Sequence, residues 1–266
     1  MSAPAAPIPP PAPANAATAH SAAPFARAVL AQTRAELTLT ARRGESVLIT
    51  IIVPALLLVF FAALKLVPAG AGTPVDFLLP GMLALAIIST GMVSLGIATA
   101  YERYYGVLKR LGSSPLPRGG LLLAKALAVL VVEVAQTVVL LALAIGLYGW
   151  RPHGSFWAAL LVFILGSACF AGLGMLMAGG LRAEATLAGA NALFLVFLLL
   201  GGSVLPVDHL PGFLADLARI LPAAPLTDAL RAAMTGTGAL PLSSVLLLAL
   251  WAVIFLGLAA RTFKWE

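Results

Sequence analysis

The residues able to do chemistry fall in two places, because only 10% of this chain of 266 residues is charged and 61% is hydrophobic. The first place is a polar island between two long apolar segments, Tyr101–Gly119, which reads YERYYGVLKRLGSSPLPRG. The second is a polar face within an apolar segment, where Glu133 is followed by Gln136 and Thr137 at helical spacing. The first place suits contact with a partner, and the second suits contact with a ligand or an ion.

The polar island has the pattern of a short helix with a defined end. Over Glu102–Leu111 one face would carry Arg103, Gly106, Val107 and Arg110, with Glu102, Tyr105 and Lys109 on the other sides. Gly112 suits the end of that helix, and Pro115 prevents it from restarting. Such a helix could pass a push from a cytoplasmic partner to the two spans beside it. The alternative is a basic loop that only fixes topology, although topology requires the charges without the helix-stop pattern.

Glu133 lies near the middle of an apolar segment, where a carboxylate costs several kcal/mol unless it is neutralised, paired or wetted. With Gln136 and Thr137 it could form a wall of a substrate pathway or contact a cationic drug. The alternative is a structural ion pair with Lys125 or with another span. Asn191, in a later apolar segment, is expected to hydrogen-bond a neighbouring span, with substrate contact as its alternative role.

The sequence patterns of catalytic and cofactor sites are missing. The chain has no G-x-x-x-x-G-K-[S/T] phosphate loop, no H-E-x-x-H and no G-x-S-x-G. Its single cysteine and three scattered histidines do not form a metal-binding pattern. We therefore expect no catalytic residue, bound cofactor or metal on this chain. The net charge of +6 is spread over loops rather than gathered in one patch, so we do not expect nucleic-acid binding.

Segments of about 20 apolar residues recur, which is enough to cross a hydrocarbon core of roughly 30 Å. They predict an all-α polytopic membrane protein with six spans: Val47–Val67, Phe77–Ala100, Leu121–Leu147, Phe156–Gly179, Ala185–Leu205 and Leu242–Ala260. We expect one transmembrane domain over residues 25–266. The Ala- and Pro-rich residues 1–24 are expected to form a disordered tail.

Shorter elements are expected around these spans. Phe25–Arg43 has an apolar side and a side with arginines, on which Glu36 is the exception. This pattern favours a helix lying in the membrane interface, and a solvated lead-in is the alternative. Between Pro206 and Pro241 the sequence predicts two short amphipathic helices, Phe213–Leu221 and Leu226–Met234.

The distribution of basic residues predicts the orientation. With the N-terminus inside, the Lys and Arg residues fall in cytoplasmic segments except for Lys65, Arg151, Arg219 and Arg231. Because basic residues accumulate on cytoplasmic loops, we expect both termini in the cytoplasm and the chain in the cell membrane.

Two stretches resemble one known family. The island resembles the E-R-E-x-G-[T/V]-L-x-x-L-x-x-[S/T]-P-[L/V] stretch of ABC-2 type transporter permeases, through Glu102, Arg103, Gly106, Val107, Leu108, Leu111, Ser114, Pro115 and Leu116. Tyr104 stands where the second Glu is frequent. Leu221–Met234, which reads LPAAPLTDALRAAM, is similar to the family's stretch before the last span. The daunorubicin-resistance branch looks most similar.

The resemblance implies a function and partners. Glu102–Ser114 would include a coupling helix seated in a groove of a separate ABC ATPase, which would bind the ATP and Mg²⁺ that this chain cannot hold. The residues carried over for this coupling are Glu102, Arg103, Gly106, Lys109, Arg110, Ser114 and Pro115. A second permease subunit, in a homodimer, would complete the pathway for a drug, lipid or glycoconjugate.

Two other function classes stay open from the sequence. A secondary carrier driven by a proton gradient would use Glu133 as its titrating group and would need no ATPase. A membrane scaffold would move no substrate at all. No internal repeat of the kind common in secondary carriers is recognisable, which favours the exporter.

Overall fold

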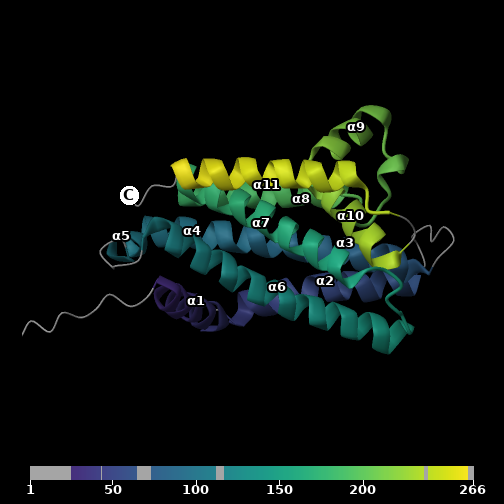
Figure 1. The fold of residues 1–266 in the computed structure, drawn as a ribbon, viewed down its shortest axis with the longest axis horizontal. Coiled ribbons are helices and arrows are strands. Elements are labelled where there is room, and N and C mark those ends of the chain that lie inside the picture. Colours follow the sequence, from purple (N-terminus) through teal and green to yellow (C-terminus); the bar gives the residue numbers. More distant parts are fainter. Residues whose placement is uncertain (1–24, 43, 65–72, 112–116, 237–238, 263–266) are drawn as a thin grey trace, which may run out of the picture.

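The computed structural model describes residues 25–42, 44–64, 73–111, 117–236 and 239–262, and within these ranges the regular elements are helices without a strand. The expected tail over residues 1–24 lies outside the described residues. The long helices run side by side as a bundle (Figure 1). The α-helices are α1 (Phe25–Arg42), α2 (Gly44–Leu64), α3 (Pro74–Ile88), α4 (Leu95–Tyr104), α5 (Val107–Leu111), α6 (Arg118–Tyr148), α7 (Phe156–Gly180), α8 (Ala183–Leu200), α9 (Gly212–Ile220), α10 (Ala223–Thr235) and α11 (Leu242–Thr262).

Five helical stretches in the described part of the chain are long and apolar enough to cross a membrane. They are Pro74–Tyr104, Gly119–Tyr148, Phe156–Gly180, Ala183–Leu200 and Leu242–Thr262. The prediction of an all-helical, multi-pass membrane protein is confirmed to this extent. For the first expected span, Val47–Val67, the described apolar stretch is Thr50–Leu64, which is shorter, so the sixth span stays a prediction.

One continuous helix lies at the centre of the bundle. α3 passes into a π-helical segment, η1 (Ser89–Ser94), and then into α4. We call this continuous helix the central helix, and most of its side chains are buried. Small residues let it approach α7 closely, since a Cβ added to Gly174 would lie 2.5 Å from the carbonyl oxygen of Gly91. Close backbone contact between helices is the usual basis of packing in lipid, where apolar side chains gain little by avoiding the solvent.

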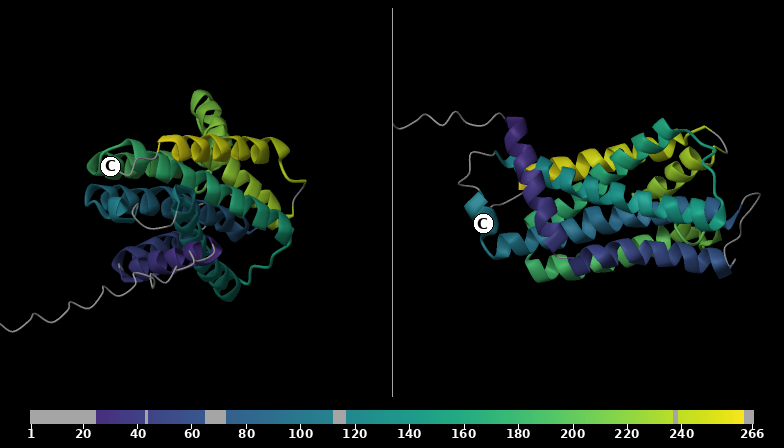
Figure 2. Two further views of the ribbon diagram at one scale, coloured as in Figure 1. Left: turned by 60° about the vertical axis from the view of Figure 1, so that its left-hand side comes forward. Right: turned by 90° about the horizontal axis from the view of Figure 1, so that it is seen from below.

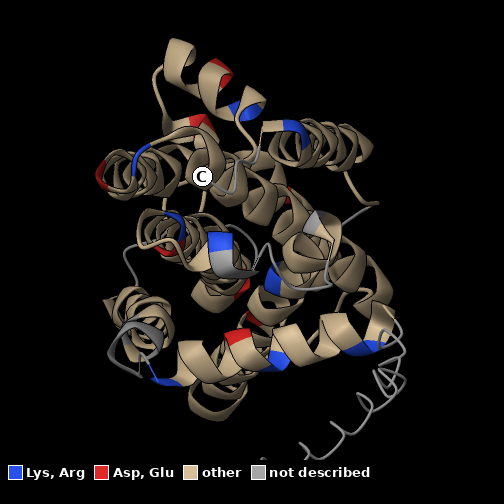
Figure 3. Ribbon diagram, turned by 90° about the vertical axis from the view of Figure 1, so that its left-hand side faces the viewer, with Lys and Arg blue, Asp and Glu red and all other residues tan. Residues whose placement is uncertain are grey.

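α1 crosses one end of the bundle instead of running along it (Figure 2). Seen from that end, it carries several charged positions (Figure 3). Its buried face is formed by Val29, Thr33 and Glu36, whereas Phe25 and Leu30 are exposed. The predicted helix is present, but the expected division of its sides is wrong: Glu36 lies on the buried face, because it has a partner there.

The opposite end of the bundle is closed by α10. The two short helices expected before the last span occur as α9 and α10, joined to α8 by a loop that holds η2 (Val207–His209). α10 is largely buried, and it packs against α3, α7 and α11. The preceding loop is equally tight, since a Cβ on Gly81 would lie 2.2 Å from the carbonyl oxygen of Ser203.

Candidate functional site

The polar island folds as two helices with a break between them. α4 continues to Tyr104, Gly106 takes a φ of +70°, and α5 begins at Val107. The expected single helix over Glu102–Leu111 is therefore wrong, because a residue in the left-handed region cannot continue an α-helix and glycine reaches that region without strain. Gly106 therefore ends the helix six residues before Gly112, the end that the sequence predicted. We call Tyr101–Leu111 the coupling segment.

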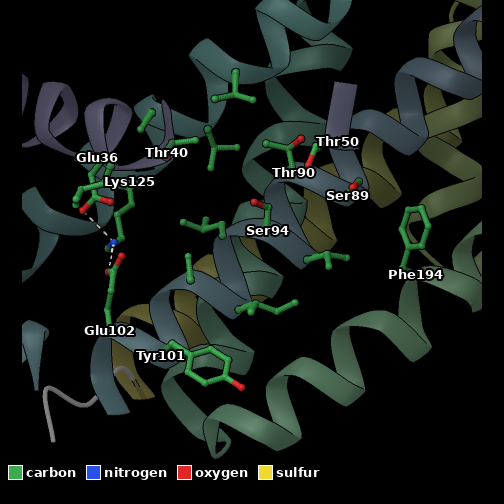
Figure 4. A pocket seen from close by; sticks show the side chains of 18 of the residues that line it. Glu36, Thr40, Thr50, Ser89, Thr90, Ser94, Tyr101, Glu102, Lys125 and Phe194 are labelled. Carbon is green, nitrogen blue, oxygen red and sulfur yellow. Dashed lines mark hydrogen bonds and ion pairs between the residues drawn. The ribbon is translucent and has the colours of Figure 1, made fainter. Parts of the chain in front are cut away.

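Glu102 points into the protein and not toward a partner. The ammonium nitrogen of Lys125 donates to Glu102 Oε2 at 2.6 Å and lies 2.9 Å from Glu36 Oε1 (Figure 4). Lys125 is only 1% exposed, and its two partners come from α4 and α1. We call Glu36, Glu102 and Lys125 the Lys125 cluster. It joins three helices, and the suggested pair between Lys125 and Glu133 is wrong.

Arg103 also binds inward. Its guanidinium donates to the carbonyl oxygens of Gly179 and Leu181, where α7 ends. The last carbonyls of a helix lack helical donors and carry partial negative charge, so a cation stabilises them. The Glu102–Arg103 pair of the motif therefore anchors the coupling segment to the helices around it.

A different set of side chains faces outward from the coupling segment. Tyr104, Tyr105, Val107 and Lys109 are exposed, while Leu108 is fully buried. The rings of Tyr101, Tyr104 and Tyr105 pack on one another, with centroids 5.1 to 6.5 Å apart. The spacing of these tyrosines along one helical turn was the signal for this surface. The side chain of Arg110, and Ser114 and Pro115 entirely, lie outside the described part.

A groove of about 690 Å³ runs from the coupling segment toward the middle of the bundle (Figure 4). Residues from α1, α2, the central helix, α6 and α8 line it. Its walls are mainly apolar, as at Val53, Leu57 and Ile97, with hydroxyl groups of Ser89, Thr90 and Ser94 among them. A largely apolar cavity of this size with a few polar groups has the character of a ligand site. The Lys125 cluster lies at one end of it (Figure 4), and Tyr105 also lines it.

The predicted polar face on α6, formed by Glu133, Gln136 and Thr137, does not lie in one environment. Gln136 is buried beside the groove, and its amide bonds to Thr50 of α2 and Thr90 of η1. Thr137 donates to the carbonyl oxygen of Glu133 in its own helix. Their place in a substrate pathway stays a prediction, since neither side chain lines the groove.

Glu133 lies apart from the groove, against α7. It is 1% exposed, and among the described residues neither carboxyl oxygen has a hydrogen-bond partner. Ser167 is its polar neighbour, without the geometry of a full hydrogen bond. A carboxyl in this position is expected to be neutral, because an isolated charge at this depth is expensive.

Asn191 lines the groove from α8, beside Phe194. Its amide donates to the carbonyl oxygen of Leu187 in the same helix, and the side chain is exposed. The expected hydrogen bond to a neighbouring span is wrong, because the groove lies where that neighbour was expected. Contact with a substrate stays open to this residue. No group of three or more potential metal-ligating side chains occurs in the described ranges.

Comparison with known proteins gives two findings. A family profile described as ABC-2 type transporter matches residues 27–235. Two curated relatives, from Escherichia coli strain K12 and Escherichia coli O157:H7, are each described as a probable multidrug ABC transporter permease, YbhR. Each is 27% identical over 153 residues, which cover 57% of this chain and 42% of the relative. The match thus spans less than half the length of these relatives.

Proposed function

Because this chain belongs to the ABC-2 type transporter family, we propose that it is the permease subunit of an ATP-driven exporter in the cell membrane. Members of this family are membrane transport subunits and not enzymes themselves. In this proposal both termini are cytoplasmic, so α1, the coupling segment and the end of α11 face the cytoplasm. ATP and Mg²⁺ bind to a separate ABC ATPase, and a second copy of the chain completes the pathway.

One observation carries the proposal: the coupling segment forms part of the wall of the groove. Tyr101, Glu102, Tyr105 and Val107 belong to the segment, and all four line the groove. A partner that displaces the segment must therefore change the shape of the groove. This is the coupling that an ATP-driven permease requires, since the energy is released on one subunit and used on another.

The outward surface of the segment suits a docking role. Tyr104, Tyr105 and Val107 offer aromatic and aliphatic contact area, and Lys109 adds a charge at the rim. Exposed tyrosines in such a cluster are typical of the residues that dominate binding energy in protein interfaces. The groove supports an amphipathic or hydrophobic cargo, a drug, lipid or glycoconjugate, because its walls offer few polar groups.

A reconstitution experiment tests this function. The full chain and the ABC ATPase encoded beside it are placed in liposomes with a fluorescent amphipathic dye or a short-chain fluorescent phospholipid. We expect probe movement that requires ATP, Mg²⁺ and the ATPase. Movement that is independent of all three would contradict the proposal.

The second candidate function is proton-coupled transport through Glu133. The buried carboxyl without a hydrogen-bond partner among the described residues favours it, because ionisable groups at this depth that are not held in an ion pair often mark proton relays. In the same liposomes, this function predicts dye movement driven by a pH gradient alone and its loss in Glu133→Gln. Movement driven by ATP in the Glu133→Gln variant at the wild-type rate would leave the exporter as the explanation.

A further inference from the structure

Two interruptions of helical hydrogen bonding face the groove. In α2, Pro54 has no N–H group, so the carbonyl of Thr50 one turn earlier loses its ordinary helical donor. In the central helix, η1 is π-helical over Ser89–Ser94, a local widening that often marks a functional position. Thr50, Pro54 and Thr90 all line the groove, and Thr50 and Thr90 lie away from the Lys125 cluster (Figure 4).

A single side chain bonds to both interruptions. Gln136 Nε2 donates to the carbonyl oxygen of Thr50 at 3.0 Å, and Gln136 Oε1 accepts from Thr90 Oγ1 at 3.0 Å. The residue is 1% exposed, so water does not readily replace either bond. An amide has one donor end and one acceptor end, and here each end has the partner that it requires.

The two interruptions are the places where the groove walls bend most easily. Helices kink at proline and at π-helical turns, because the regular ladder of hydrogen bonds is already broken there. α4 leads from η1 to the coupling segment without another break, so a displacement of the segment reaches η1 along a regular helix. α2 forms another wall of the groove and carries Pro54 within it, where a helix bends most readily.

We propose that Gln136 is the positioning residue that sets the width of the groove. Its amide holds α2, one turn before Pro54, to the π-helical turn of the central helix, and the groove changes width when these two hydrogen bonds break and re-form. The link to a transport cycle rests on the proposed function. We call the two hydrogen bonds of Gln136 to Thr50 and Thr90 the clasp. The clasp is part of the fold, so it can be measured without transport.

Distance measurement between spin labels tests the clasp. Labels at Val53 on α2 and Asn191 on α8 report on the groove, because both positions line it and are exposed. In the full chain in liposomes, we expect Gln136→Leu to shift or broaden the distance distribution, and Thr90→Val to do so less. Thr90→Ser keeps the hydroxyl and should match the wild type. The matched control is Thr137→Val, which removes a hydroxyl that donates to the Glu133 carbonyl oxygen of its own helix. A Gln136→Leu distribution that equals this control would overturn the proposal.

A second pair of variants tests the bond to Thr50. Pro54→Ala supplies an N–H group to the Thr50 carbonyl, so the donor of Gln136 becomes dispensable there. We expect Gln136→Met to change the distances less in the Pro54→Ala background than alone, as a double-mutant cycle. Strictly additive changes would show that Gln136 does not act through this carbonyl.

Transport separates a positioning role from a merely structural one. In liposomes with the ABC ATPase and the dye, we expect Gln136→Leu to lower the dye moved per ATP hydrolysed by about tenfold, the effect of losing two buried hydrogen bonds. ATP hydrolysis itself should continue. An unchanged ratio would contradict the role in the cycle. If the wild type moves no dye with ATP, the proposed function fails, and the distances still decide whether the clasp exists.

Discussion

Each end of the bundle holds a cation, Lys125 fully buried at one end and Arg231 partly buried at the other, and the two are held in different ways. Lys125 is bound by side-chain carboxylates that come from two other helices, α1 and α4. Arg231, on α10 at the opposite end, donates to the carbonyl oxygen of Gly202 at 2.8 Å and lies over the ring of Phe77, 4.0 Å from its centroid. Asp228, its acidic partner, is in the same helix.

The difference has a mechanical meaning. Carboxylates on separate helices move with those helices, so the Lys125 cluster can rearrange when α1 or the coupling segment shifts. Arg231 is instead bound to a backbone carbonyl, that of Gly202. The next residue, Ser203, packs so closely on Gly81 that there is no room for a Cβ atom there. We call the end with the Lys125 cluster the inner end and the end closed by α10 the outer end, after the orientation proposed above. We therefore expect the inner end to transmit movement and the outer end to resist it. The following variants test that contrast.

The largest effect is expected from Lys125→Met. It leaves two buried carboxylates without their shared cation, which costs about 3–5 kcal/mol when one partner of a buried pair is removed. Thermal unfolding of the purified chain, followed by circular dichroism in detergent, measures the loss. Lys109→Met is the control, because Lys109 is an exposed lysine on the nearby coupling segment. If Lys125→Met loses no more stability than Lys109→Met, the Lys125 cluster does not hold the inner end together.

Gly81→Ala tests the rigidity of the outer end. The new Cβ would lie 2.2 Å from the carbonyl oxygen of Ser203, so a backbone has to shift, at a cost of about 1–3 kcal/mol. Gly119→Ala is the matched control, since nothing lies within 4 Å of its added Cβ. The same unfolding measurement applies. If both variants unfold at the same temperature, the backbone at the outer end can shift at little cost, and the rigidity proposed for it is wrong.

Tyr105→Ala tests whether the inner end binds a partner. Removing an exposed aromatic side chain at a docking surface should weaken binding of the ABC ATPase about tenfold, with little change in the chain's own stability. Phe156→Ala is the control, because Phe156 and Tyr105 are both 70% exposed and Phe156 lies outside the coupling segment. Affinity measured in detergent or nanodiscs distinguishes them. Equal affinities for both variants would place the docking surface elsewhere.

The smallest effect is a pH dependence at the outer end. Burial raises the pKa of Asp228, while the charge of Arg231 partly opposes that shift. The folded chain then holds this proton more tightly than the unfolded chain, so the stabilisation is complete below the ordinary Asp pKa of about 3.9 and is lost as pH rises through the higher folded value. Unfolding midpoints compared with those of Asp228→Asn should diverge over this interval. A constant difference across it would contradict the raised pKa.

Much of the fold follows from the sequence, but the contacts within the site do not. Runs of apolar residues predicted the five long helices, because hydropathy over about 20 residues reports directly on the membrane. The break at Gly106 was missed, since glycine tolerates both a helix and a left-handed turn and the choice is made by the surroundings. The outward tyrosines were missed because the charges of the motif drew the interpretation to Glu102 and Arg103.

The Lys125 cluster left a signal that periodicity alone did not interpret. Glu36 was the residue that did not fit its helix face, and Lys125 was a cation in an apolar segment. Each was an anomaly by itself. Because buried charges are almost always paired, two anomalies of opposite sign near the same end of the bundle predict each other. The hydrogen bonds of Gln136 could not be predicted from the sequence in this way, because one of its partners is a backbone carbonyl and every residue has one.

The burial of Lys125 also gives the chain a built-in chemical reporter. Primary amines react with acylating reagents only where the reagent can reach the uncharged nitrogen, and Lys125 is 1% exposed at the end of the groove. Lys109, which is exposed on the coupling segment, would be labelled in every state and serves as the internal reference. The ratio of the two modified peptides in a mass spectrum would therefore record how often the inner end opens, without a mutation or an added probe.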